Sequence, residues 1–206
     1  MPDIKTVIFD LGGVLVDWNP DYVYTPEYFE SPEKREYFFK NVCTPDWNEN
    51  QDAGYPIAIA TEEKLKEFPE WEQPIRDFYG RWVEMLGGPI EESVELFRQL
   101  KQNKQLRFYA LTNWSAETFP IALERFDFLK WFDGILVSGE EKIRKPFPEF
   151  YQLLVDKFHV DLASAVFIDD NLRNLQAGES LGIRSIHFQS PAQLKEELQK
   201  LGLAVK

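Results

Sequence analysis

Short apolar runs that end at polar residues recur along the chain, and amphipathic segments separate them. The runs are rich in β-branched and aromatic residues and are nearly continuous in their hydrophobicity. This pattern is typical of strands that are buried on both faces of a parallel sheet. The predicted strands cover residues 6–9, 107–111, 134–137, 165–168 and 184–188.

The segments between these strands have the spacing of helices. In the first of them Val94, Leu96, Phe97 and Leu100 form one apolar stripe. Alternation of strands and helices predicts an α/β doubly wound parallel sheet. The predicted helices cover residues 91–102, 115–126, 147–158, 171–181 and 191–201.

One long segment, residues 18–89, interrupts this alternation. It contains no convincing strand, several Pro residues and helix-like stretches at 33–42, 61–68 and 73–86. So long an excursion favours an inserted all-helical subdomain over a loop. We therefore expect a core formed by residues 1–17 and 90–206, with a helical cap at 18–89 that covers the carboxyl ends of the strands.

Composition narrows the possible partners. The 206 residues include 23 basic and 35 acidic side chains, which gives a net charge of −12 and argues against nucleic-acid binding. No apolar run approaches the roughly 18 residues of a membrane span, so no membrane partner is expected. Cys43 is the only cysteine, which excludes an intramolecular disulfide and favours a reducing, cytoplasmic location.

Polar residues lie at or just beyond the ends of the predicted strands, and in this architecture those positions meet at one crevice. Three carboxylates brought together repel one another unless a cation compensates for them, and Mg²⁺ is the simplest such cation. A lysine and a hydroxyl beside the cation suit a phosphoryl group. The residues are Asp10, Thr112, Asn113, Lys145, Asp169 and Asp170.

Four motifs in this order resemble those of the haloacid dehalogenase-like (HAD) hydrolases. They are 9–17 (FDLGGVLVD), 111–113 (LTN), 145–146 (KP) and 167–171 (FIDDN). The resemblance covers nearly the whole chain, including a helical cap after the first strand of a Rossmann-like core. It is strongest to a bacterial subgroup that contains a sugar-1-phosphate phosphatase and predicted 2-haloacid dehalogenases.

The resemblance implies a role for each motif. Asp10 would be the nucleophile and form an aspartyl-phosphate that water then hydrolyses. Thr112 and the backbone N–H of Asn113 would bind phosphoryl oxygens. Lys145 would neutralise charge on the phosphoryl group and orient Asp10.

The resemblance also implies a Mg²⁺ site. Asp10, the carbonyl of Gly12 and Asp170 would hold the ion, and Asp169 would bind it directly or through water. Asn171, together with Asn174, would orient water or phosphate.

Gly12 departs from the family pattern, because most phosphatases of the superfamily carry an aspartate there as general acid and base. Such help is typically worth about 10²–10⁴ in rate. Its loss is tolerated best when the leaving oxygen is weakly basic, as in a sugar-1-phosphate, a phenolic phosphate or an acyl phosphate. Asp17 is a candidate replacement, and a turn carboxylate is the plainer interpretation of that residue.

Three functions remain to be compared. The leading one is a Mg²⁺-dependent phosphatase of a small phosphorylated metabolite. A metal-independent 2-haloacid dehalogenase is weaker, because family dehalogenases have an aromatic residue at position 12 and Ser-Asn at 169–170. A non-catalytic phosphate-binding or regulatory protein is the third. Cap residues that could meet sugar hydroxyls, or form a solvated loop, are Asp46, Asn48, Gln51 and Asp52.

Overall fold

The computed structural model describes residues 3–206 and contains a five-stranded parallel sheet in the order β5-β4-β1-β6-β7. β1 is central, and its four residues pair with β4 on one side and β6 on the other. This confirms the predicted α/β doubly wound fold. The strands are β1 (Thr6–Phe9), β4 (Arg107–Thr112), β5 (Gly134–Val137), β6 (Ala165–Asp169) and β7 (Arg184–His187).

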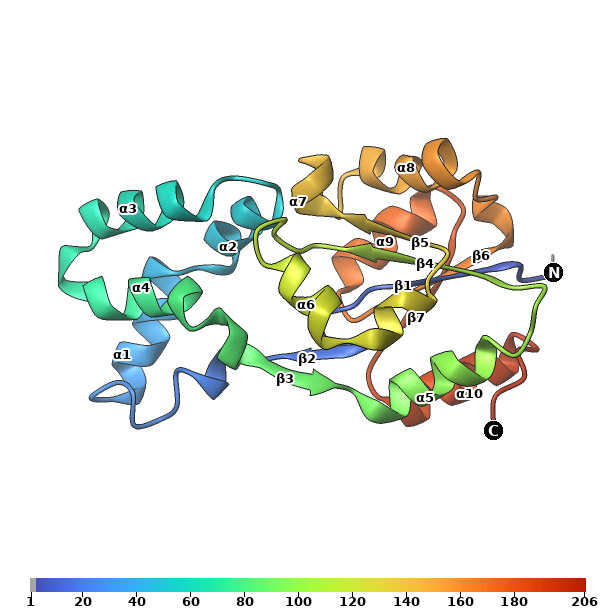
Figure 1. The fold of residues 1–206 in the computed structure, drawn as a ribbon, viewed down its shortest axis with the longest axis horizontal. Coiled ribbons are helices and arrows are strands. Elements are labelled where there is room, and N and C mark those ends of the chain that lie inside the picture. Colours follow the sequence, from blue (N-terminus) through green and yellow to red (C-terminus); the bar gives the residue numbers. More distant parts are fainter. Residues whose placement is uncertain (1–2) are drawn as a thin grey trace.

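Helices cover both faces of the sheet (Figure 1), and alternate residues of the central strand belong to the two separate clusters of side chains beneath them. Val7 and Phe9 pack in a cluster with residues of α5 (Glu91–Leu100) and α10 (Pro191–Lys200). Ile8 packs on the opposite face with α8 (Pro148–Phe158) and α9 (Leu172–Ser180). Both faces of the sheet are therefore covered, which explains the continuous apolar runs. The shorter helices α6 (Phe119–Arg125) and α7 (Ser138–Glu141) follow β4 and β5.

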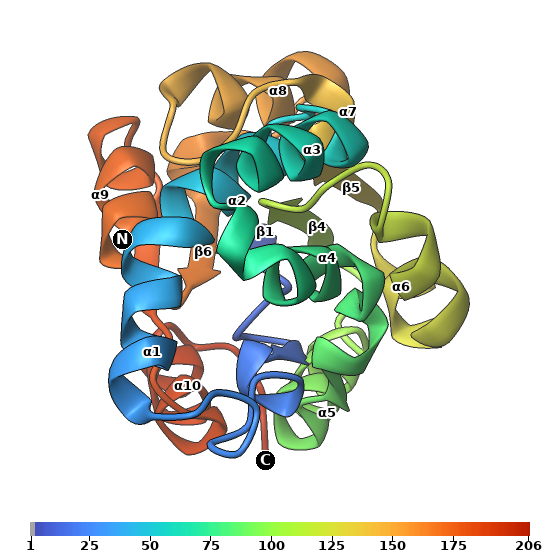
Figure 2. The same cartoon turned by 90° about the vertical axis from the view of Figure 1, so that its left-hand side faces the viewer.

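The insertion after β1 is mainly helical and lies beyond one end of the sheet (Figures 1 and 2). The insertion contains four α-helices, and a π-helical turn, Phe38–Val42, continues the first of them. Aromatic side chains around Tyr24 fill the interior of the insertion. The helices are α1 (Pro32–Tyr37), α2 (Pro45–Asp52), α3 (Ile57–Glu67) and α4 (Glu72–Gly80).

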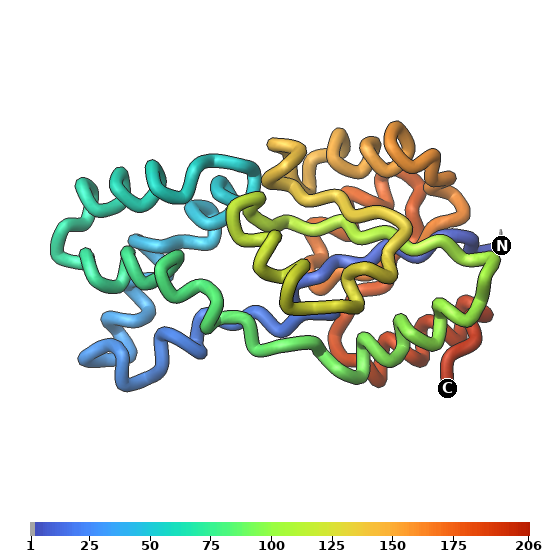
Figure 3. The backbone as a smooth tube through the Cα atoms, in the orientation of Figure 1, coloured from blue at the N-terminus to red at the C-terminus, as the bar shows by residue number. Residues whose placement is uncertain are grey.

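The prediction of an insertion without strands is wrong at its two ends. β2 (Val16–Trp18) and β3 (Leu86–Pro89) form an antiparallel ribbon through which the chain enters and leaves the cap. Figure 3 shows these two crossings side by side. The ribbon is three to four residues long and contains Gly87, Gly88 and Pro89, which are not typical of strands.

Several predicted helix boundaries also differ from the structure. The helix predicted to run over 73–86 ends at Gly80, and the helix predicted from 115 begins at Phe119 after a turn in which Ser115 accepts two backbone hydrogen bonds. The α2 helix was not expected, because its sequence is mostly polar. Within residues 3–206, no helix has the length and apolar character that crossing a membrane requires.

Candidate active site

Asp10 lies directly after β1, at the edge where the parallel strands end. Its Oδ1 accepts a hydrogen bond of 2.7 Å from the backbone N–H of Leu11, and its Oδ2 lies 2.8 Å from Nζ of Lys145. Burial raises the pKa of Asp10 to about 8; Lys145 opposes this rise, whereas Asp169 and Asp170 add to it. The carboxyl group of Asp10 is thus held in place, and Lys145 alone does not offset the burial and the neighbouring carboxylates that disfavour its ionised form.

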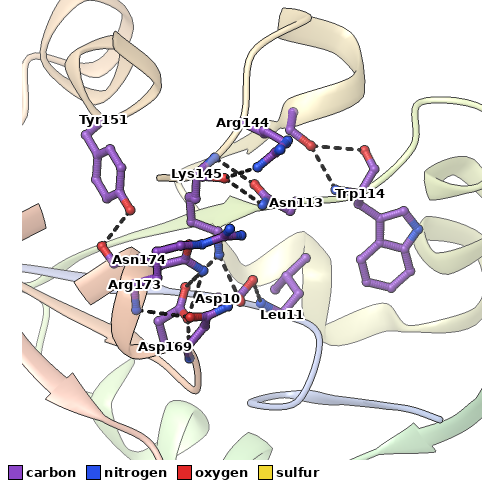
Figure 4. A network of polar contacts seen from close by, with 12 residues as sticks. Asp10, Leu11, Asn113, Trp114, Arg144, Lys145, Tyr151, Asp169, Arg173 and Asn174 are labelled. Carbon is purple, nitrogen blue, oxygen red and sulfur yellow. Dashed lines mark hydrogen bonds and ion pairs between the residues drawn. The ribbon is translucent and has the colours of Figure 1, made fainter. Parts of the chain in front are cut away.

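Lys145 is completely buried, and its position is fixed from both ends (Figure 4). Its Nζ donates a hydrogen bond of 2.7 Å to Asp169, while Asn113 accepts from its backbone N–H at 2.8 Å and donates to its carbonyl at 3.1 Å. Burial acts to lower the pKa of Lys145, but Asp10 and Asp169 outweigh it, so the pKa lies above its usual value. The ammonium group is therefore charged and lies against the carboxyl group of Asp10.

Asp169 is fully buried and supports Lys145 from behind. Its Oδ1 accepts from the backbone N–H of Asn171 at 2.7 Å, and Nδ2 of Asn174 lies 3.1 Å from each of its oxygens. Tyr151 in turn donates to the carbonyl of Asn174. Both oxygens of Asp169 are thus engaged by these donors and by Lys145.

Asp170 is the exposed member of the acidic group. Its side chain lies against Gly13, where an added Cβ would stand only 2.4 Å from Oδ2 of Asp170, and Gly13 also has a φ of +73°. Burial, followed by Asp169, raises the pKa of Asp170. Gly13 therefore provides both the turn after β1 and the space that this carboxylate occupies.

The acidic group fits a divalent cation. Ligand oxygens of Asp10, Asp169 and Asp170 lie within 4.8 Å of one another. Three ionised carboxylates and the single ammonium of Lys145 would leave two negative charges uncompensated (3 − 1 = 2). Oxygen donors of this kind are the ones that Mg²⁺ prefers. The excess negative charge and the carboxylate oxygens of this group both match Mg²⁺.

Thr112 is buried at the end of β4, and its hydroxyl has no hydrogen-bond partner among the described residues. A buried hydroxyl without a partner is costly unless a ligand supplies one. This matches the phosphoryl-binding role that the sequence motif implies for Thr112.

Above Asp10 lies a cavity of about 230 Å³ between the core and the cap. It is smaller than the roughly 300–1,000 Å³ that is usual for drug-sized ligands. Wider hollows between α2 and α3 and between α5 and α10 contain none of the predicted strand-end residues, and the first of them is lined by Gln51 of the cap. The residues that line the cavity are Asp10, Gly12, Gly13, Trp18, Asn48, Asp52, Trp82, Asn113, Trp114 and Asp170.

The cap contributes Asn48 and Asp52 to this cavity from α2, a helix that the sequence pattern missed. One hydrogen bond and two ion pairs fasten α2 to the core. The carbonyl of Asp52 accepts a hydrogen bond of 2.5 Å from Ser138, and Glu49 pairs with Arg144 at 2.8 Å and with Arg173 at 2.5 Å.

The signal for α2 was present in the sequence. Thr44 caps the helix by accepting from the N–H of Trp47, and Pro45 occupies the first turn. The residues of α2 form no apolar stripe, so the spacing of hydrophobic residues gave no indication of a helix there.

Among the predicted residues that do not line the cavity, Asn171 and Asp17 make other contacts. Asn171, which was expected to bind water or substrate, is exposed and caps α9 by accepting from the N–H of Arg173 at 3.0 Å. Asp17 accepts a hydrogen bond from the hydroxyl of Tyr22 and does not line the cavity, whereas its neighbour Trp18 does. Asp17 therefore has no place in the cavity lining from which it could replace an acid at Gly12.

Comparison with known proteins finds phosphatases of similar sequence. The chain is 29% identical over 203 residues to a sesquiterpene phosphatase, AstK, of Aspergillus oryzae, with 96% of each chain covered. It is 26% identical over 194 residues to a phosphorylated carbohydrates phosphatase of Thermotoga maritima, covering 89% of this chain and 84% of that protein.

A solved structure shares the fold: an Asp12Ala mutant of a HAD-family enzyme of Bacteroides thetaiotaomicron in complex with magnesium and inorganic phosphate. It has a TM-score of 0.68 and 20% identity, and the match covers 90% of this chain and 94% of that one. The family model for haloacid dehalogenase-like hydrolases matches residues 4–182. These matches and the four strand-end motifs lead to one conclusion: the chain belongs to the haloacid dehalogenase-like hydrolases.

Proposed function

We propose that the protein is a Mg²⁺-dependent phosphatase that hydrolyses a small phosphate ester through an aspartyl-phosphate on Asp10. The observation that carries the proposal is the ion pair between Asp10 and the buried Lys145, at a cavity that Asp170 also lines. A carboxylate that could attack phosphorus, a fixed positive charge and a second, free carboxylate at one point support the proposal.

Asp10, the carbonyl of Gly12 and Asp170 would hold the ion, with Asp169 close enough to act through a water. When bound, Mg²⁺ supplies positive charge that offsets the carboxylates and polarises the phosphoryl oxygens. The fit rests on the charge and the oxygen ligands of the acidic group.

The chain's own residues would then carry out the reaction. Asp10 attacks phosphorus in line with the ester oxygen, and the P–O bond to the leaving group breaks. Lys145, the hydroxyl of Thr112 and the backbone N–H of Asn113 bind the phosphoryl oxygens as charge shifts. Water then attacks phosphorus and releases phosphate from Asp10.

Turnover of p-nitrophenyl phosphate tests this proposal. We expect hydrolysis with Mg²⁺, loss of activity on chelation and recovery when Mg²⁺ is restored. Asp10→Asn should abolish turnover. Asp156→Asn, which changes an exposed acid on α8, should leave it intact. Activity that survives chelation, or an active Asp10→Asn protein, would contradict the proposal.

The dehalogenase alternative fits the cavity less well. A 2-haloacid is an anion, and the cavity lining contains three acids, Asp10, Asp52 and Asp170, and no basic residue. Without a metal this lining repels the substrate's carboxylate. Halide release from 2-chloropropionate in the presence of chelator is the experiment that would favour the dehalogenase.

The cavity walls indicate a class of substrate. Trp18, Trp82 and Trp114 provide apolar surface, while Asn48 and Asp52 provide polar groups on the cap side. Flat apolar surface beside a few polar groups suits a sugar phosphate, which has both C–H faces and hydroxyls. We propose a cytoplasmic sugar phosphate as the substrate. Assay of sugar phosphates against isoprenyl phosphates of similar size distinguishes this class from a purely apolar one.

A further inference from the structure

The cavity contains one acid for which the proposed reaction has no role so far. Position 12 is a glycine, which has no side chain to give or take a proton, and a Cβ added there would meet no atom within 4 Å. Of the three acids in the lining, Asp10 is the nucleophile and Asp170 is the exposed carboxylate of the metal group. Among the described lining residues, only Asp52 remains to exchange a proton with a substrate.

Asp52 is held in a defined position on the cap side of the cavity. Its Oδ2 accepts a hydrogen bond of 3.0 Å from Nδ2 of Asn48, and the backbone N–H of Ser115 donates to its carboxyl group. The hydroxyl of Tyr79 donates to Oδ1 of Asn48 at 2.9 Å, which keeps the amide nitrogen turned toward Asp52. The bond from Ser138 to its carbonyl fixes the backbone as well.

The surroundings of Asp52 favour a proton on its carboxyl group. Burial, followed by repulsion from Glu49, raises its pKa to about 7, while Arg144 and Lys145 lower it. The remaining titratable neighbour is Tyr79 of α4, whose own pKa burial raises well above its usual value. A carboxyl group with this pKa both gives and takes protons near neutral pH.

We propose that Asp52 is the general acid and base that replaces the side chain missing at Gly12. This inference rests on the proposed phosphatase function. In the first step Asp10 forms a bond to phosphorus, the bond to the ester oxygen breaks, and the Asp52 carboxyl gives its proton to that oxygen. In the second step the Asp52 carboxylate takes a proton from water as the water oxygen binds phosphorus, and the Asp10–phosphorus bond breaks. Atoms and charge balance over the two steps, and Asp52 ends protonated as it began.

Leaving groups of different basicity test this role. With Mg²⁺ present, Asp52→Asn should lower kcat for glycerol phosphate, whose alkoxide is strongly basic, by about 100-fold or more. Release of the weakly basic nitrophenolate from p-nitrophenyl phosphate needs no acid, so its first turnover should stay fast. Later turnovers should be slow, which gives a burst of nitrophenolate and a phosphorylated protein visible by intact mass.

Glu62→Gln is the matched control, because Glu62 is an exposed acid of the cap, on α3, and does not line the cavity. It should behave like wild type with both esters. Asp52→Glu should recover part of the glycerol phosphate activity, which a residue needed only for folding or for shaping the cavity would not do.

The outcomes are separable. Equal loss with both esters without a burst, or no loss at all, would overturn the role of Asp52 and leave the phosphatase function standing. A wild-type protein that hydrolyses neither ester with Mg²⁺ would overturn the proposed function and this inference together.

Discussion

Lys145 and Asp169 form an ion pair closed to solvent: Nζ lies 2.7 Å from Oδ2, and both side chains are 0% exposed. Removing one partner of a buried pair leaves an uncompensated charge and typically costs about 3–5 kcal/mol. In this protein Lys145 also compensates Asp10, so two carboxylates lose their partner at once.

We therefore expect Lys145→Met to lower the free energy of unfolding by about 3–5 kcal/mol and to abolish phosphatase activity. Urea denaturation monitored by tryptophan fluorescence measures the first effect. Lys157→Met is the control, because Lys157 is about half exposed and pairs with Glu141 at the surface; its cost should be about 0–1 kcal/mol. Equal stability of the two variants would contradict the burial argument.

Gly13→Ala should weaken Mg²⁺ binding more than it weakens the fold. The new methyl group would stand 2.4 Å from Oδ2 of Asp170 and force that carboxylate away. Thermal shift on adding Mg²⁺ measures the effect, and we expect it to shrink or vanish. Gly202→Ala carries a similar backbone strain, at φ +78°, with no atom within 4 Å of the added group, so its Mg²⁺ response should match wild type. A normal response in Gly13→Ala would show that Asp170 does not bind the ion in this position.

The stability of the protein should depend on pH through Asp52. Burial raises its pKa from 3.8 to about 7, so the folded state binds a proton that the unfolded state has already released between these values. Stability from this group is therefore lost as pH rises from about 4 to about 7. Asp52→Asn should be more stable than wild type at pH 8, by about 1–3 kcal/mol, and the difference should shrink toward pH 4. Urea titrations at several pH values measure it, and a difference that does not change with pH would contradict the shift.

Glu49 links the cap to the core through Arg144 and Arg173. Glu49→Gln should lower stability by only about 1–2 kcal/mol, because the pairs are partly buried. Amide hydrogen exchange in α2 should become faster, since this helix loses its ionic contacts with the core. Glu30→Gln breaks an exposed pair with Lys34 inside the cap and serves as the control. Unchanged exchange in α2 would mean that the contacts of Asp52 with Ser138 and Ser115 hold the helix without Glu49.

The core and the strand-end part of the site could be predicted because their signals are local. The strands are short and apolar, and β1, β4 and β6 each end at or next to a residue of the site, as with Phe9 and Asp10 or Ile168 and Asp169. Placement at a strand end is enough to bring such residues together once the sheet is parallel.

The cap side of the site could not be predicted for the opposite reason. Asn48 and Asp52 reach the cavity through a polar helix whose partners lie far along the chain, such as Ser138, 86 residues away. Trp18 enters the cavity from a three-residue strand. Contacts between residues so far apart in the chain leave no short-range pattern in the sequence. The sequence alone therefore could not decide whether Asp52 contacts a sugar or belongs to a solvated loop.

The ribbon of β2 and β3 has an evolutionary consequence. The chain leaves and re-enters the core through two adjacent strands. The segment between Asn19 and Met85 is therefore joined covalently to the core at one place. A different module grafted at that junction would meet the same nucleophile and lysine without disturbing the sheet. In this protein, however, such an exchange would also remove Asp52, so new specificity would have to arrive together with a new proton donor.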